Sequence, residues 1–183
     1  MNFELSEEQK LVRSSVRQFA EREIKPLAKE LDEKAEFSIE LTKKMGELGL
    51  FGMYLPEKYG GQNTDTLSYI IAVEELARVD GSHAATLAAH NSLGIGPIYY
   101  YGTEEQKQKY LPKLCTGDKL WAFGLTEPEA GSDSRGTKTN AVKEGDKWKI
   151  NGSKIFITNG SSEISMGSAI QAVTKIHDDG KKE

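Results

Sequence analysis

The segment Leu120-Trp-Ala-Phe-Gly-Leu-Thr-Glu-Pro-Glu-Ala-Gly-Ser-Asp-Ser-Arg-Gly136 separates two parts of the chain that differ in the spacing of their apolar residues. Before it, from Ser6 to about Leu114, apolar side chains recur at the steps of amphipathic helices. After it they alternate with polar ones, as strands do. Helices first and strands second, without βα alternation, argue against a doubly wound nucleotide-binding fold. We therefore expect an α+β protein, with a helical domain over residues 1–117 and an antiparallel β unit over residues 118–183.

The helical part carries start and stop signals. Ser6 with Gln9 has the spacing of a capping box, so a helix should start there and run toward Pro26. That proline should kink or weaken the final turns. The other expected helices are a short one from Ser38 to Gly49, one over residues 67–77, an alanine-rich stretch after Gly81 toward Pro97, and one that starts at the second capping box, Thr103 with Gln106.

Strands are expected throughout the second part. Leu120–Thr126 should form the first of them. Asn151-Gly152 is typical of a hairpin turn, with Trp148 and Ile150 on the strand before it and Ile155 and Ile157 on the return strand. A further strand is expected over Ala169–His177.

The composition excludes several classes of protein. The 183 residues are 37% hydrophobic and 28% charged, an ordinary globular mixture, and the formal charge of −4 does not indicate nucleic acid as a partner. No apolar run approaches the roughly 20 residues of a membrane span, and the first residues do not resemble a signal peptide. We therefore expect a soluble intracellular protein. The single cysteine, Cys115, excludes an internal disulfide framework and is expected to be an inert thiol.

Several apparent motifs have the wrong order or spacing. Gly131–Lys138 resembles a phosphate-binding loop, but such loops place Gly-Lys before the Ser or Thr. The histidines His83, His90 and His177 are not spaced as a metal-ligand set, so no metal site is expected. The adjacent carboxylates Glu74 and Glu75 point in different directions on a helix and are expected to be solvated.

The loop Ala130-Gly131-Ser132-Asp133 allows two interpretations. Its backbone amides and the Ser132 hydroxyl suit a phosphate or the polar edge of a ring. Alternatively, Ser132 and Asp133 only close a turn at a hairpin corner, which is the interpretation that spacing alone favours.

Five sequence blocks, in the same order, resemble those of the flavin-dependent acyl-CoA dehydrogenases. The resemblance covers nearly the whole chain up to Asn159. The blocks are Leu55-Pro-Glu-Lys-Tyr-Gly-Gly61, Glu74-Glu-Leu-Ala77, Gly102-Thr-Glu-Glu-Gln-Lys-Gln-Lys-Tyr-Leu111, Gly124-Leu-Thr-Glu-Pro-Glu-Ala-Gly-Ser-Asp133 and Lys147-Trp-Lys-Ile-Asn-Gly-Ser-Lys-Ile-Phe-Ile-Thr-Asn159.

The resemblance implies a fold and a reaction. Members of the family have an N-terminal helical domain, a central β-barrel domain and a C-terminal helical bundle, with FAD between barrel and bundle. Residues 118–183 would then be a truncated antiparallel β-barrel domain. The implied reaction is FAD-dependent α,β-dehydrogenation of an acyl-CoA thioester to an enoyl-CoA. An electron-transfer flavoprotein would accept the electrons, and the enzyme would be a homo-oligomer, typically a homotetramer, in the cytoplasm or the mitochondrial matrix.

The resemblance also implies roles for particular residues. Three groups would contact FAD: Phe123, Leu125 and Thr126 at the pyrimidine edge; Gly131 and Ser132 at the diphosphate; and Phe156, Ile157 and Thr158 beside the ring, with Thr158 near N5. Ser132 would also touch the substrate, at its thioester or pantetheine arm. The family commonly has Trp where this chain has Phe156, which keeps a stacking surface but lacks an N–H donor.

No catalytic residue is assigned, because the resemblance places the carboxylate that removes the α-proton beyond Glu183. Were a base present in this chain, Glu127 would be the first candidate, since the motif places it beside the flavin edge. Two alternatives to the dehydrogenase remain open. One is a non-catalytic fragment or paralogue that keeps the fold for binding or assembly, and the other is a related flavoprotein oxidase.

Overall fold

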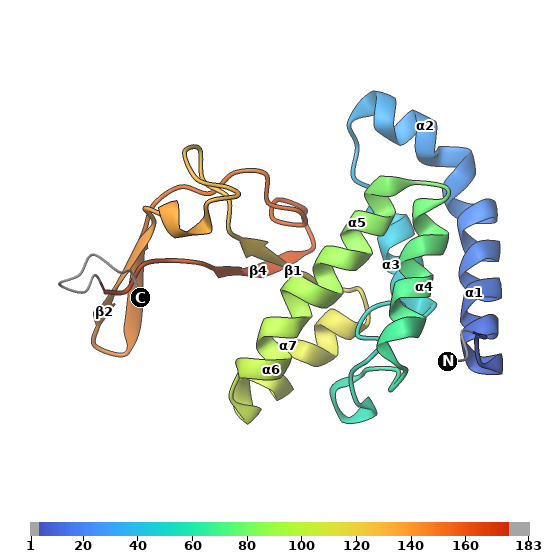
Figure 1. Cartoon of the computed structure of the whole chain (residues 1–183), viewed down its shortest axis with the longest axis horizontal. Coiled ribbons are helices and arrows are strands. Elements are labelled where there is room, and N and C mark those ends of the chain that lie inside the picture. Colours follow the sequence, from blue (N-terminus) through green and yellow to red (C-terminus); the bar gives the residue numbers. More distant parts are fainter. Residues whose placement is uncertain (1–3, 176–183) are drawn as a thin grey trace.

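The computed structural model describes residues 4–175 as a helical body with a smaller set of strands beside it (Figure 1). The helical body contains α1 (Glu7–Phe19), η1 (Ala20–Ile24), α2 (Lys25–Lys34), α3 (Ile39–Glu47), η2 (Glu57–Tyr59), α4 (Thr66–Ala77), α5 (Gly81–Ala89), η3 (His90–Ile95), α6 (Gly96–Tyr101) and α7 (Glu104–Cys115). The rest comprises β1 (Leu120–Gly124), η4 (Ser134–Gly136), β2 (Asn140–Glu144), β3 (Lys147–Asn151) and β4 (Ser165–Ile170).

Both predicted capping boxes are confirmed. At the start of α1 the Gln9 amide donates to Ser6 Oγ over 3.2 Å, and the Ser6 amide donates to Gln9 Oε1 over 3.0 Å. Thr103 and Gln106 repeat the pattern at α7. The helix that was expected to weaken near Pro26 instead passes through the π-helical turn η1 and continues as α2. Pro26 lies in the first turn of α2, where its missing N–H costs little.

Helices α1 and α4 pack along each other and bury a charged residue. The prediction that Glu75 is solvated was wrong, because its side chain is only 2% exposed. Arg17 donates to both Glu75 oxygens over 2.7 and 2.8 Å, and Arg78 adds a third bond at 3.0 Å. The hydrogen bonds from Arg17, supported by Arg78, hold the pKa of Glu75 below its ordinary value, against the effect of burial. The ion pairs with Arg17 and Arg78 therefore allow the Glu75 carboxylate to be buried between α1 and α4.

Two apolar clusters form the core. The larger joins α1, α3, α4 and α5 to the strands, since Leu120 and Ile164 belong to it. The smaller cluster is formed by three parts of the chain: η3, α7, and the segment after α3 that contains Leu55 and Tyr59. Cys115 belongs to this second cluster and is buried. Burial raises its pKa to about 12, in keeping with the expected inert thiol.

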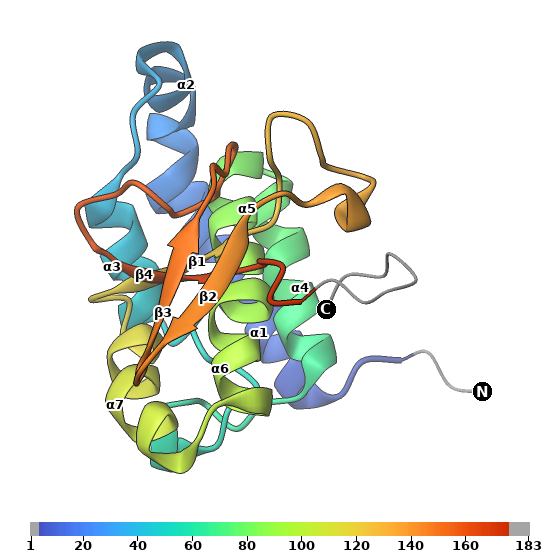
Figure 2. The same cartoon turned by 90° about the vertical axis from the view of Figure 1, so that its left-hand side faces the viewer.

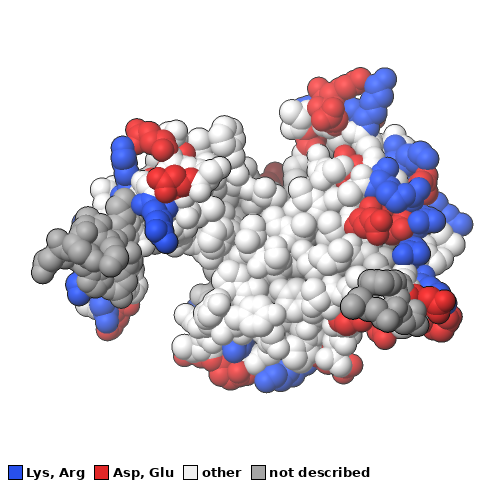
Figure 3. All heavy atoms as spheres, viewed as in Figure 1, with Lys and Arg blue, Asp and Glu red and all other residues white. Residues whose placement is uncertain are grey.

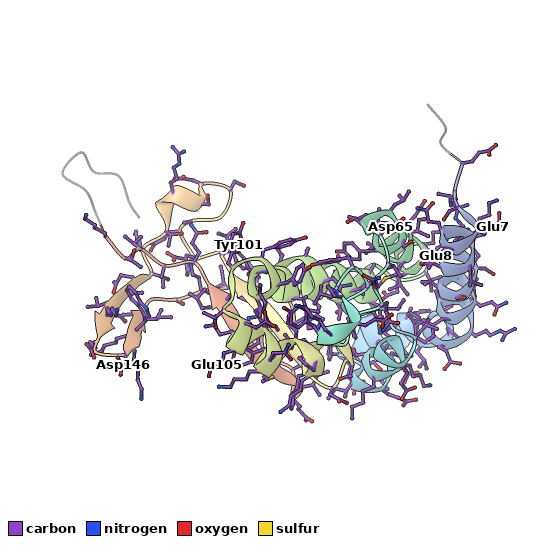
Figure 4. The ribbon with its side chains drawn as sticks, turned by 90° about the horizontal axis from the view of Figure 1, so that it is seen from below. Glu7, Glu8, Asp65, Tyr101, Glu105 and Asp146 are labelled. Atoms are coloured by element: carbon purple, nitrogen blue, oxygen red, sulfur yellow. The ribbon has the colours of Figure 1, made fainter. Side chains whose placement is uncertain are left out.

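Among residues 4–175 the strand part contains one antiparallel hairpin, β2–β3, which lies at the end of the molecule away from α1 in Figure 1 and faces the viewer in Figure 2. Its tip is at Gly145 and Asp146, and Figure 4 shows Asp146 at the opposite end of the molecule from Glu7. The predicted turn at Asn151-Gly152 was therefore wrong, and residues 155–157 do not form a strand. Gly145 has a φ of +62°, which glycine adopts without strain, so the two-residue turn falls there.

The other pairing, β1 with β4, is parallel, which the expected antiparallel unit did not include. The β2–β3 hairpin lies between β1 and β4 in the chain. After it the chain comes back beside β1, and β4 runs in the same direction as β1. After β4 it leaves β1 and pairs with β2, where the Ala141 amide donates to the Val173 carbonyl and the Val173 amide to the Thr139 carbonyl. Within residues 4–175 the strands form two small sheets and do not close a barrel. The strand expected over Ala169–His177 was largely wrong. Strand β4 starts at Ser165 and ends at Ile170, residues 171–175 are not part of it, and residues 176 and 177 lie outside the described part.

Candidate functional site

A buried histidine attaches β1 to the helical body. His90, in η3, is fully buried. The Trp121 amide donates to its Nδ1 over 3.1 Å, and its Nε2 donates to the Leu114 carbonyl over 2.9 Å. These two bonds require a neutral ring protonated at Nε2. Burial lowers the pKa of His90 to about 4, so the ring stays neutral at physiological pH and has a structural role.

The turn that follows β1 lies against a segment about 30 residues later in the chain. The Ile155 amide donates to the Thr126 carbonyl over 2.9 Å, and Lys154 Nζ donates to the Leu125 carbonyl over 2.8 Å. Farther along this segment, Asn159 Nδ2 donates to the Thr86 carbonyl in α5 over 3.2 Å. The structure thus places Leu125 and Thr126 beside Lys154 and Ile155, and Asn159 attaches the same segment to α5.

Glu127 and Lys154 form a buried ion pair at this junction, with side chains 6% and 9% exposed. Lys154 Nζ lies 2.8 Å from Glu127 Oε1, and the carboxylate also accepts from the Lys138 and Thr139 amides over 2.8 and 3.0 Å. The ammonium of Lys154, with these hydrogen bonds, holds the pKa of Glu127 well below its ordinary value. A carboxylate with these partners is ionised and fully engaged, so it is poorly suited to act as a base.

The loop after this junction exposes hydrogen-bond donors. A Cβ built at Gly131 would meet only the Thr126 methyl group, at 3.7 Å, so the space above the glycine is open. Ser132 is exposed, and among residues 4–175 neither its hydroxyl nor its amide makes a hydrogen bond. The loop is instead held by Gln171 Nε2, which donates to the Ser134 carbonyl over 3.1 Å. Ser132 therefore does not close the turn with its side chain.

Phe156 is an exposed aromatic residue on strained backbone. Its φ is +56° and its side chain is 89% exposed. Left-handed backbone at a non-glycine residue costs of order 1–3 kcal/mol and is frequent at functional sites. Thr158, two residues on, is exposed as well.

Comparison with known proteins identifies the family. A family model described as "Acyl-CoA dehydrogenase, N-terminal domain" matches residues 6–118, and one described as "Acyl-CoA dehydrogenase, middle domain" matches residues 122–180. The chain belongs to the acyl-CoA dehydrogenase family. It is 56% identical to a short-chain specific acyl-CoA dehydrogenase of Clostridium acetobutylicum over 160 residues, which are 87% of this chain and 42% of that protein.

Solved structures agree with this membership. A chain from the electron transferring flavoprotein study of Acidaminococcus fermentans matches with a TM-score of 0.90 and 47% identity, over 96% of this chain and 46% of that one. Glutaryl-CoA dehydrogenase of Mycobacterium smegmatis in complex with FADH2 matches with a TM-score of 0.88 and 37% identity, over 94% of this chain and 44% of that one. The chain thus spans less than half the length of these family members.

The residues that the family resemblance selected occupy neighbouring segments. Phe123 is half-buried on β1, and Leu125 and Thr126 follow in the turn. Gly131 lies over Thr126. Phe156, Ile157 and Thr158 directly follow the pair of residues that is bonded to this turn.

The ion pair itself was not predicted from the sequence. Glu127 was expected only as a possible base and Lys154 had no expected role, although a lysine directly before the apolar run Ile155-Phe-Ile157 was a usable signal for a buried partner. Among the described residues, no group of three or more His, Cys, Asp or Glu side chains could hold a metal ion, and no helix has the length and apolar character needed to cross a membrane.

Proposed function

We propose that this chain is the N-terminal part of an enzyme that dehydrogenates an acyl-CoA thioester between its α and β carbons, with FAD as cofactor and an enoyl-CoA as product. Residues 1–117 would be its helical domain, and residues 118–183 the first part of a central β domain whose antiparallel barrel needs further strands. The observation that carries the proposal is the attachment of the Leu125–Thr126 turn to Lys154 and Ile155, which directly precede residues 156–158. The FADH2 complex of the related glutaryl-CoA dehydrogenase supports the choice of cofactor.

The donor chemistry of the site suits a flavin. The Thr126 amide donates to no acceptor among residues 4–175, so it and the Thr126 hydroxyl are available to a polar ring edge. The open space over Gly131 and the free donors of Ser132 suit a diphosphate. Phe156, with Ile157 and Thr158, offers an apolar surface for a flat ring. When bound, FAD would accept the hydride that leaves the β carbon of the substrate.

The base of this reaction is not assigned to Glu127. Glu127, the first candidate from the sequence, is held ionised by Lys154 and two amides. We therefore assign no catalytic residue within this chain, and propose that the base comes from another part of the complete enzyme. The role of Ser132 toward the substrate remains part of the proposal, since its exposed hydroxyl is free to bind a thioester or pantetheine group.

The partners are also proposals. The face of α5 and α6 in Figure 3 carries few charged residues, whereas Lys, Arg, Asp and Glu cluster over α1 and α2 and near the β2–β3 hairpin. An uncharged face suits an acyl chain or another subunit. We propose an acyl-CoA substrate, a homo-oligomer that is typically a homotetramer, and an electron-transfer flavoprotein as acceptor. The match to a chain from the Acidaminococcus fermentans flavoprotein study supports this acceptor.

Titration of the purified chain with FAD, followed by flavin fluorescence, tests the proposal. Ser132→Ala should weaken binding by about tenfold or more, because it removes a hydroxyl that faces a charged group. Ser14→Ala, an exposed change on α1, is the matched control and should bind FAD as the unaltered chain does. Equal affinities for all three would mean that the loop is only a turn. If neither this chain nor the complete protein binds FAD, the non-catalytic alternative is favoured. Oxygen consumption by the complete enzyme would favour a flavoprotein oxidase.

A further inference from the structure

Lys154 is a buried cation in the segment that follows β3. Its stem packs over Gly124, where an added Cβ would lie 3.4 Å from Lys154 Cγ. Its ammonium donates to the Leu125 carbonyl and to Glu127 Oε1, both over 2.8 Å. Burial of an ammonium is costly unless it is paired and hydrogen-bonded. Both partners of Lys154 come from the one turn that follows β1.

Glu127 links the ion pair to a third stretch of chain. Its carboxylate accepts from the Lys138 and Thr139 amides, which precede β2. Its own amide donates to the Ala130 carbonyl over 2.7 Å and closes a tight turn. Three separate stretches of chain, residues 125–130, 138–139 and 154–155, therefore meet at one ion pair.

These bonds also orient the turn. The carbonyls of Leu125 and Thr126 both accept from residues 154 and 155, so they face inward. The Thr126 amide donates to no acceptor among residues 4–175, which leaves it available on the opposite side. A peptide whose carbonyl is held on one side presents its N–H on the other.

We propose that Lys154 is a positioning residue of the flavin site, which holds the Leu125–Thr126 turn in register with residues 156–158 so that both present their donors to one ring. This rests on the proposed function. A purely stabilising role would not require charge, since buried ion pairs are often replaced by apolar residues without loss of stability. What the ion pair adds is position, because a buried ammonium is satisfied only where the Leu125 carbonyl and the Glu127 carboxylate both reach it.

Lys154→Met is the decisive variant, since it keeps the length of the side chain and removes its charge and donors. Lys138→Met is the matched control. It removes an exposed ion pair with Glu129, while the Lys138 amide still donates to Glu127. Two quantities are measured on the full chain: the affinity for FAD, by fluorescence, and the hydrogen-exchange rate of the Ile155 amide. Lys154→Met should weaken FAD binding by about tenfold or more and accelerate exchange at Ile155, and Lys138→Met should change neither. Far-UV circular dichroism without urea should stay unchanged in both variants. Lys154→Met should unfold at lower urea, because it leaves Glu127 buried without its partner, so FAD affinity and exchange are compared where both variants are fully folded.

A coupled variant tests whether the two charges act as a unit. If they do, adding Glu127→Gln to Lys154→Met should weaken FAD binding no further than Lys154→Met alone. Additive losses, or normal FAD affinity and Ile155 exchange in Lys154→Met, would overturn the inference. Should Lys154→Met fail to fold, Lys154→Gln, which keeps one short donor, is measured in its place under the same criteria. If the unaltered chain binds no FAD, the Ile155 exchange rates alone decide on the positioning role, and the proposed function fails if the complete protein binds none either.

Discussion

His90 makes the stability of this chain depend on pH in a defined direction. The ordinary pKa of 6.5 applies to the unfolded chain, whereas burial lowers the folded value to about 4. Between about pH 4 and pH 6.5, His90 is protonated in the unfolded chain but stays neutral in the folded chain. Stability from His90 is therefore complete above about pH 6.5 and is lost as the pH falls toward 4. The gap between the two values corresponds to about 3 kcal/mol.

Replacement of His90 separates its contribution to the pH dependence of stability from that of the other titratable groups. His90→Gln keeps an amide donor for the Leu114 carbonyl but leaves the Trp121 amide without its acceptor. A buried unpaired donor costs about 1–3 kcal/mol, so the variant should be less stable than the unaltered chain at pH 7.5. Because it lacks the titrating ring, the difference between the two chains should shrink as the pH falls toward 4.5.

Urea unfolding, followed by circular dichroism in steps from pH 7.5 to 4.5, measures the free energy of unfolding of the unaltered chain and of His90→Gln. The carboxylates are shared by the two chains, so their contributions cancel in the difference. The unaltered chain should lose about 2–3 kcal/mol more than His90→Gln across this range. Parallel stability curves would refute the assignment of a neutral, buried His90 at the junction of η3 and β1.

Three further predictions follow from the packing and the ion pair. Gly46→Ala should destabilise the chain by about 1–3 kcal/mol in urea, because the added Cβ would lie 2.0 Å from the Thr116 carbonyl oxygen; Gly81→Ala, with nothing within 4 Å, should be neutral or slightly stabilising, and equal effects would contradict the packing. Cys115 should resist iodoacetamide at pH 8 until the chain is unfolded, because its folded pKa is about 12; rapid alkylation of the native chain, followed by mass spectrometry, would show an accessible thiol. The chain alone, with FAD, should not bleach the flavin on anaerobic mixing with acyl-CoA thioesters, because Glu127 is engaged by Lys154; substrate-dependent bleaching would mean that a base lies within this chain.

Features that depend on neighbours along the chain were predictable without the structure. Ser6 with Gln9 and Thr103 with Gln106 predicted the starts of two helices, because a capping box is complete within four residues. The change of apolar period after Leu114 predicted the order of helices and strands. The motif blocks predicted the family, which both domain matches bear out.

Contacts between residues far apart in the chain were not predictable in this way. The burial of Glu75 depends on Arg17, which lies 58 positions earlier in the chain, and the role of Lys154 depends on Glu127, 27 positions earlier. Strand pairing also joins distant residues, since β1 pairs in parallel with β4, which starts at Ser165. Even in the β2–β3 hairpin, local composition did not predict where the turn forms. Asn151-Gly152 has the composition of a hairpin turn, yet Gly152 packs against Thr139 and the turn forms at Gly145. The energy of a buried charge or a strand pair is set by partners that local spacing does not specify, because folding chooses among them through three-dimensional packing.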